Sequence, residues 1–151
     1  MSAESIIIRL AAAADSPRLT VLSAQLGYPV HEAELRARLV DHILPDPDCV
    51  LYVAQTADGE VIGWAHAFIR PLLTDPLHIE LGGLVVDERY RSQGIGERLM
   101  EYIEAWACER GCEAVYVRSN VKRERAHRFY LRIGYRVIKT SLTFVKPLPR
   151  K

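Results

Sequence analysis

The chain has 151 residues, 49% of them hydrophobic, and its 20 basic and 19 acidic residues leave a net charge of +1. This length and apolar content predict one domain over residues 1–151 with a full core. The balanced charge argues against a general nucleic-acid binder, because no dominant basic field is present. The apolar run at 5–14 contains Arg9 and is far too short to span a membrane. We therefore expect neither a nucleic-acid partner nor a membrane.

The cysteines are three in number, at Cys49, Cys108 and Cys112, and no secretory signal is visible. An odd count of this kind is typical of a reducing compartment, so we expect a cytoplasmic protein. Cys108 and Cys112 are four residues apart, but two ligands do not make a zinc site. We expect these cysteines to be small apolar fillers and expect no metal.

The first half of the chain predicts a strand, two helices and a hairpin. The strand is expected at 6–8 and the helices at 16–25 and 31–44, where Pro17 suits a first helical turn. Two further strands, at 50–55 and 61–69, are joined by Asp58-Gly59, which is a strong hairpin signal.

The second half predicts a strand at 77–86 in which Gly82-Gly83 indicates a bulge or a close backbone approach. The elements expected after it are a helix at 92–109, a strand at 113–118, a helix at 123–133 and strands at 135–138 and 142–146. The complete order is β-α-α-β-β-β-α-β-α-β-β. It predicts an α/β fold with a mixed sheet of about seven strands and about four helices.

The stretch from Leu84 to Met100, LVVDERYRSQGIGERLM, combines a strand end, a basic turn and a helix start. A helix N-terminus has unpaired N–H groups and partial positive charge, glycines allow close approach, and Arg91 adds a charged donor. The stretch therefore predicts anion binding, with Arg89 as a second possible donor or a solvated turn residue. The dinucleotide fingerprint fails because Leu99 stands where its third glycine belongs, and the P-loop fails because Glu97 follows Gly96.

Arg91-Ser92-Gln93-Gly94-Ile95-Gly96 instead resembles the pyrophosphate-binding loop of the GNAT superfamily of acetyl-CoA-dependent N-acetyltransferases. The order of the predicted elements is similar to the GNAT fold along essentially the whole chain. A second signature, at 125–135, resembles the GNAT helix that ends in an aromatic pair and a Gly-Tyr step. Ala126 and Tyr130 match its Asn-x-x-Ala-x-x-x-Tyr pattern, but Arg123 stands at the Asn position and Asn120 lies three residues earlier. Either residue can supply the polar contact.

The resemblance implies acetyl-CoA as co-substrate. Backbone groups of Leu84 to Val86 would pair with its pantetheine arm, and an N–H near Leu84 or Val85 would polarise the thioester carbonyl. Its pyrophosphate would bind the amides of Gln93 to Gly96 beside Arg91. The cofactor-binding residues expected on this basis are Leu84, Val85, Val86, Arg91, Ser92, Gln93, Gly94, Ile95, Gly96, Asn120 and Arg123.

The resemblance also implies catalytic roles. Tyr130 matches the tyrosine that many members use as a general acid toward the CoA sulfur. It would either protonate the thiolate or only donate a hydrogen bond to it. The alternative is that Tyr130 has no catalytic role and packs in the core. Glu80 is the first choice for the general base, directly or through water, against a structural salt bridge. His78 and His66 are weaker candidates that could share the acceptor cleft.

We expect an enzyme that moves the acetyl group of acetyl-CoA to a primary amine by direct attack in a ternary complex. A small metabolite or an aminoglycoside-like amine is slightly favoured as acceptor, and a protein or peptide amine is the alternative. A non-catalytic acyl-CoA sensor is the alternative of another class. Tyr28, His31 and Asp75 are candidate acceptor contacts, and a homodimer is possible because GNAT domains commonly dimerise.

Overall fold

The computed structural model describes residues 5–150, and they fall into two compact units, one ending at Arg118 and one starting at Ser119. The first unit is built on a five-stranded sheet with the order β1-β2-β3-β4-β5. Its strands are β1 (Ile7–Leu10), β2 (Cys49–Gln55), β3 (Val61–Arg70), β4 (His78–Val86) and β5 (Val115–Val117). Neighbouring strands pair antiparallel except β4 and β5, which are parallel, so the sheet is mixed.

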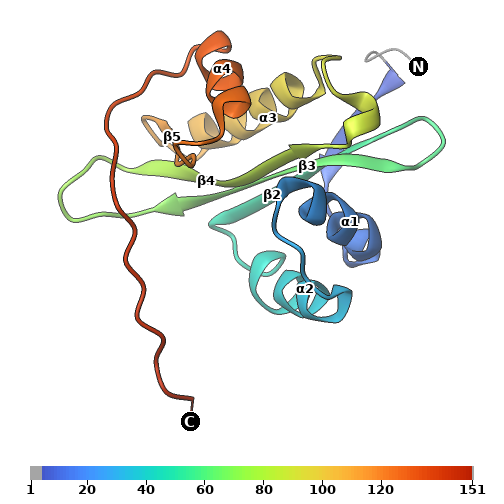
Figure 1. The fold of residues 1–151 in the computed structure, drawn as a ribbon, viewed down its shortest axis with the longest axis horizontal. Helices are drawn as coiled ribbons and strands as arrows, with labels where there is room; N and C mark the ends of the chain where they lie inside the picture. Colours follow the sequence, from blue (N-terminus) through green and yellow to red (C-terminus); the bar gives the residue numbers. More distant parts are fainter. Residues whose placement is uncertain (1–4, 151) are drawn as a thin grey trace. The chain divides into compact units, whose positions relative to one another are not determined.

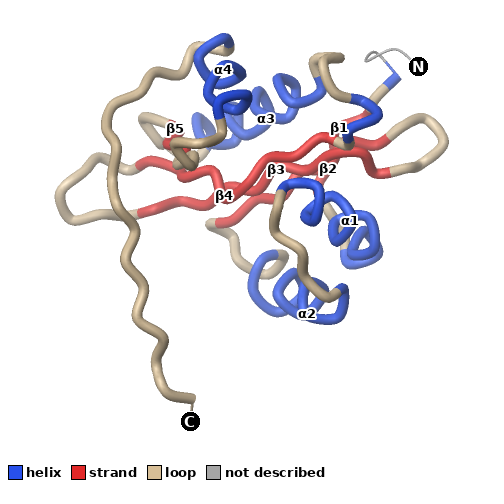
Figure 2. Tube along the Cα trace, viewed as in Figure 1, coloured by secondary structure: helices blue, strands red, loops and turns tan. Residues whose placement is uncertain are grey.

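Three α-helices belong to the first unit, and a fourth belongs to the second. They are α1 (Ser16–Leu26), α2 (Glu32–Arg38), α3 (Ile95–Glu109) and α4 (Glu124–Arg132). Helix α2 continues directly into a π-helical turn at Leu39–Ile43, and short 3₁₀ turns lie at Ala13–Asp15 and Glu88–Tyr90. Helices α1 and α2 cover one face of the sheet and α3 covers the other (Figure 1; Figure 2).

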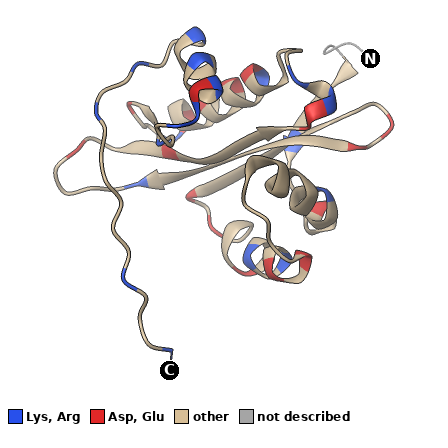
Figure 3. Ribbon diagram, viewed as in Figure 1, with Lys and Arg blue, Asp and Glu red and all other residues tan. Residues whose placement is uncertain are grey.

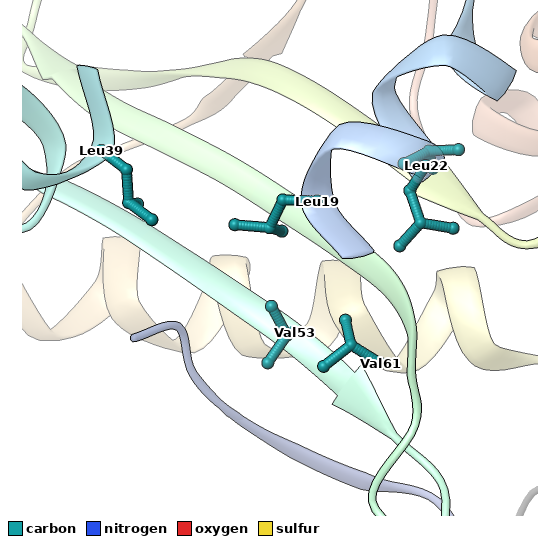
Figure 4. Close-up of a cluster of buried hydrophobic side chains, with 6 residues drawn as sticks. Leu19, Leu22, Leu39, Val53 and Val61 are labelled. Atoms are coloured by element: carbon teal, nitrogen blue, oxygen red, sulfur yellow. The ribbon is translucent and has the colours of Figure 1, made fainter. Parts of the chain in front are cut away.

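The face under α1 and α2 is held by an apolar cluster. Its helical members are Leu19, Leu22 and Leu39, and its strand members include Val53 and Val61 (Figure 4). Leu19 and Leu22 are one turn apart and therefore lie on one side of α1. Burial of each of these side chains stabilises the fold by about 1.5–3 kcal/mol, so this cluster fixes α1 against the strands.

The opposite face is covered by α3. Its buried residues Ile95, Leu99, Ile103 and Ala107 recur every four positions and form one stripe along the helix. The helix begins after Gly94 and ends before Gly111, both in left-handed conformation, at φ +80° and +74°. The apolar spacing in the sequence therefore predicts this helix and its buried side correctly, although it begins three residues later than the expected position 92.

Most of the predicted elements form. The Asp58-Gly59 hairpin joins β2 and β3, with Gly59 at φ +94°. The helix expected at 31–44 forms as an α-helix followed by the π-helical turn, and Leu35, Leu39 and Ile43 all pack on the core as their spacing predicts. The bulge expected at Gly82-Gly83 is confirmed, because His66 pairs with Gly83 whereas Ala67 pairs with Leu81, which leaves Gly82 unpaired with β3.

The expected strand count of about seven is wrong for the residues that the structure describes, where five strands form. The two missing strands are those predicted at 135–138 and 142–146; neither segment carries helix or strand. Val137, Leu142 and Phe144 are largely exposed there. A strand exists only when its backbone pairs with a neighbour, and alternating apolar residues alone do not supply that pairing.

Charged residues of both signs are interspersed along the ribbon, in line with the net charge of +1 (Figure 3). Within residues 5–150, no helix combines the length and the hydropathy that a membrane crossing requires.

Candidate active site

Strands β4 and β5 pair over only three positions. The pairing ends at Leu81 with Val117, whereas β4 continues to Val86. Beyond Leu81, β4 keeps its partner β3 on one edge, and the described residues supply no strand on the other edge. An open edge of this kind offers backbone N–H and C=O groups to an extended ligand.

The alternation of hydrogen bonds between β3 and β4 shows which backbone N–H and C=O groups of β4 point toward that open edge. Asp87 N–H donates to the carbonyl of Ile62 at 2.7 Å. Because backbone groups in an antiparallel pair alternate in direction, those of Val85 turn toward β3, and those of Leu84 and Val86 turn away from it. Arg91 Nε donates to the Val86 carbonyl at 3.4 Å. Leu84, rather than Val85, therefore presents its N–H outward.

The turn after β4 has the backbone geometry of an anion site. Ser92 has φ +65° and Gly94 has φ +80°, and Ser92 is the non-glycine residue with positive φ in the described chain. A Cβ on Gly94 would meet nothing within 4 Å, so it is backbone conformation and not space that favours glycine there. Residues 92–94 are exposed, and the first N–H groups of α3 have no acceptor in their own helix.

Asp87 organises this turn, although it is not among the site residues expected from the sequence. It is buried at the end of β4, accepts hydrogen bonds from the Arg89 backbone and guanidinium, and accepts another from Arg18 of α1 at 2.8 Å. Hydrogen bonds from Arg89 hold the pKa of Asp87 well below its usual range. Arg89, which also pairs with Glu60 at 2.9 Å, is thus bound to carboxylates of its own chain. The one sequence signal for Asp87 was an acid directly after a buried strand.

Glu80 lies on the sheet face that α1 and α2 cover, at the opposite end of β4. It is 8% exposed, and its Oε1 accepts from Arg70 Nη1 at 2.8 Å and from Arg118 Nε at 2.6 Å. The three side chains come from the end of β3, from β4 and from just after β5. All the hydrogen bonds that described residues donate to Glu80 fall on Oε1, so Oε2 is the oxygen to meet a ligand or water.

The two candidate histidines share that face. His78 is 2% exposed, its ring stacks on Tyr116 at 4.1 Å, and its Nδ1 lies 3.2 Å from the Pro76 carbonyl. His66 packs over the bulge, where a Cβ on Gly82 would come within 2.5 Å of its Nδ1. Burial lowers the pKa of His66, which keeps its ring neutral. The Nε2 atoms of both rings are buried without a hydrogen-bond partner among the described residues.

Three of the predicted site residues, Tyr130, Asn120 and Arg123, lie in the second unit. Tyr130 packs edge-on against Phe129 at 5.2 Å and Tyr135 at 5.8 Å, and burial raises its pKa to about 12. Asn120 Oδ1 accepts from Lys122 N–H at 2.9 Å, and its carbonyl accepts from Arg123 N–H at 3.0 Å. Asn120 thus shapes the turn that leads into α4, and Arg123 is the residue just before that helix.

The weaker acceptor candidates all lie on the surface. Tyr28 and His31 lie between α1 and α2, Asp75 lies in the β3–β4 loop, and all three are exposed. Within residues 5–150, no group of three or more His, Cys, Asp or Glu side chains is arranged to hold a metal ion.

Comparison with known proteins places this geometry in a family. The model of the acetyltransferase (GNAT) family matches residues 18–135. An aminoalkylphosphonate N-acetyltransferase of Salmonella typhimurium is 33% identical over 129 residues, covering 85% of this chain and 79% of that protein. An aminoglycoside N(6')-acetyltransferase type 1 of Stenotrophomonas maltophilia is 26% identical over 110 residues, covering 70% and 71%. The solved structure of aminoglycoside N-acetyltransferase AAC(6')-Iy in complex with CoA has a TM-score of 0.83 at 21% identity, covering 93% and 94%.

The chain belongs to the GNAT acetyltransferase family and is an acyltransferase enzyme. The resemblance carried by Arg91 to Gly96 and by the 125–135 signature is thereby confirmed at the level of family and fold. Acetyl-CoA is the co-substrate of this family.

Proposed function

We propose that this protein transfers the acetyl group of acetyl-CoA to the primary amine of a small molecule by direct attack in a ternary complex. The observation that carries the proposal is the juxtaposition, on one continuous stretch, of the open β4 edge at 84–86 and the left-handed turn at 92–94. An extended pantetheine arm fits the edge, and a pyrophosphate fits the turn and the N-terminus of α3. Arg91, which already contacts the Val86 carbonyl, stands between the two.

The chemistry requires a polarised thioester carbonyl. We assign this role to the N–H of Leu84, which the ladder phase directs away from β3. A backbone donor aimed at the developing oxyanion needs no reorganisation during the reaction, and removing such a donor typically costs 10²–10³-fold in rate. By the same alternation, the backbone groups of Val85 point toward β3 and not toward the ligand.

The neutral amine nitrogen attacks the carbonyl carbon, the C–S bond breaks, and the proton that the new amide nitrogen then loses passes through solvent to the departing thiolate. An ammonium near pKa 10.4 must lose its proton before it attacks. Glu80 Oε2 is the proposed acceptor for that proton, directly or through a water, because the arginine hydrogen bonds fall on the other oxygen. His78 and His66 are proposed to line the same face, where the Nε2 atoms of both rings are buried without a hydrogen-bond partner among the described residues.

Tyr130 is proposed to act on the CoA sulfur as a hydrogen-bond donor. With its pKa raised to about 12, full proton transfer to a thiolate near 8.5 is uphill on the order of 5 kcal/mol. A phenol that keeps its proton still stabilises the departing thiolate. This favours the hydrogen-bonding role over complete protonation.

The relatives named above act on amines of two kinds, aminoalkylphosphonates and aminoglycosides. Their names support a small-molecule acceptor for this chain. The test is a screen of acetyl-CoA consumption, read as free thiol, over aminoalkylphosphonates, amino acids, polyamines, aminoglycosides and a lysine peptide. Thiol release that depends on one small amine, with the N-acetylated product found by mass spectrometry, is the expected result. Binding of acetyl-CoA without turnover on any amine would instead indicate a sensor.

A further inference from the structure

The candidate acceptor face carries two arginines to which the proposed reaction assigns no role. Glu80 is buried there, and two guanidinium groups, of Arg70 and Arg118, converge on its one oxygen at 2.8 and 2.6 Å. The three residues are far apart in sequence but come from neighbouring strands. Two positive charges and one negative charge leave this cluster with a net charge of +1.

Both arginines retain hydrogen-bonding capacity. A guanidinium has five N–H donors, and within the described residues each of these side chains spends one on Glu80. Their side chains are 38% and 46% exposed, whereas that of Glu80 is 10% exposed. The buried carboxylate of Glu80 therefore holds the two more exposed guanidinium groups, and the remaining N–H groups of these arginines are open to solvent.

The surroundings do not neutralise the surplus positive charge. His66 is kept neutral by burial, and Glu80 is the carboxylate that pairs with either arginine in the described chain. A polycationic acceptor would meet two guanidinium groups here, and the carboxylate beside them is already paired with both.

We infer that the acceptor is an amine that also carries an oxyanion group, a carboxylate or a phosphonate, and that Arg70 and Arg118 bind that group. This inference rests on the proposed function and names its substrate class. Planar guanidinium groups bind carboxylate and phosphonate oxygens through paired, charge-assisted hydrogen bonds. Glu80 Oε2, on the same cluster, receives the amine end, so both ends of a zwitterion find a partner.

Matched pairs of acceptors test the inference directly. Aminomethylphosphonate is compared with methylamine, and β-alanine with β-alaninamide, by initial rates of thiol release at saturating acetyl-CoA. The anionic member of at least one pair is expected to have a kcat/KM at least about 10-fold above its partner, the scale of one charge-assisted hydrogen bond. The two pairs separate a phosphonate from a carboxylate site. A polyamine or an aminoglycoside as the best acceptor overturns the inference.

Variants locate the effect. Arg70→Gln and Arg118→Gln are each expected to raise KM for the anionic amine about 10-fold or more while KM for acetyl-CoA stays unchanged, and Arg118→Lys is expected to retain part of the binding. The control is Arg38→Gln, since Arg38 is an exposed α2 residue paired with Glu34 at 3.9 Å, and this variant is expected to match the parent. Equal losses for the anionic amine and its uncharged partner overturn the inference.

The two proposals fail in different ways. Acetyl-CoA turnover on amines without any preference for an anionic group overturns the inference and leaves the proposed function intact. Absence of acetyl-CoA binding, measured by calorimetry on protein whose folding is verified by circular dichroism, overturns the proposed function itself.

Discussion

The two ends of β4 present different kinds of chemical group. At the end near Val86, the groups offered are backbone amides, presented by an open strand edge and a left-handed turn. At the other end, the groups offered are side chains, Glu80 of β4 with Arg70 at the end of β3 and Arg118 just after β5. A backbone site depends on local conformation, which neighbouring residues set. A side-chain site depends on strand register, which is decided far away in the sequence.

The largest expected effect concerns the residue that holds the backbone site in shape. Asp87→Ala removes the carboxylate shared by Arg18 and Arg89. We expect the free energy of unfolding in urea to fall by about 3 kcal/mol, because charge-assisted hydrogen bonds from Arg18 and from the backbone and side chain of Arg89 are lost. Asp41→Ala, at an exposed position of the π-helical turn, is the control and should change stability by about 0.5 kcal/mol or less. Equal stability of the two variants would show that Asp87 does not organise the turn.

The next effect concerns the side chain assigned to the sulfur. Tyr130→Phe should lower kcat about 100-fold with KM for acetyl-CoA unchanged, because a donor acting only as the thiolate develops is lost. Tyr102→Phe, on an exposed α3 position that contacts Tyr52 edge-on at 5.4 Å, should leave kcat within about twofold. An unchanged kcat in Tyr130→Phe would contradict the role of the phenol.

A smaller effect is expected from a substitution that disturbs the left-handed backbone of the turn before α3. Gly94→Ala forces a Cβ into a left-handed conformation at φ +80°, at a cost of about 1–2 kcal/mol. We expect KM for acetyl-CoA to rise about 10-fold. Gly111→Ala is a matched control, because Gly111 has φ +74° at the other end of α3 and likewise has open space around its Cβ. If both variants lose stability and neither changes KM, the turn does not bind the cofactor.

The smallest effect is a pH dependence on the acceptor side. Burial lowers the pKa of His66, so the unfolded chain binds a proton more readily than the folded one, and stability must fall as the pH drops below about 6.5. Between pH 7 and 5.5 the loss is at most about 1 kcal/mol. His66→Gln should flatten this part of the curve, whereas His42→Gln, at an exposed position, should not. Asp87, with its lowered pKa, adds a separate loss only in stronger acid, below about pH 4.

The sequence predicted the parts of the fold that depend on local conformation and not those that depend on long-range strand pairing. The stripe from Ile95 to Ala107 and the Asp58-Gly59 turn are local patterns, and both form as expected. The segments at 135–138 and 142–146 also have strand-like composition, but neither pairs with a strand among the described residues, and neither forms a strand. A helix satisfies its own hydrogen bonds, whereas a strand depends on a neighbour that its own residues do not specify.

The candidate site divides in the same way. The turn that we propose for the pyrophosphate could be predicted from Arg91 and the glycines alone, because these residues stand at neighbouring positions in the sequence. The pairing of Glu80 with two arginines could not, since Arg70 and Arg118 lie 10 and 38 residues from it along the chain. Nor could the ladder phase, which distinguishes Leu84 from Val85 as the outward donor, because it depends on where the bulge at Gly82 falls.

By itself, then, the sequence determined the family and predicted the turn that we propose for the pyrophosphate, because glycines, a basic turn and a helix start act over a few adjacent residues. Only the tertiary structure decided which β4 amide faces the open edge and which charges surround Glu80. Both follow from strand register, and register is set by long-range pairing of the sheet and by burial of one of its faces.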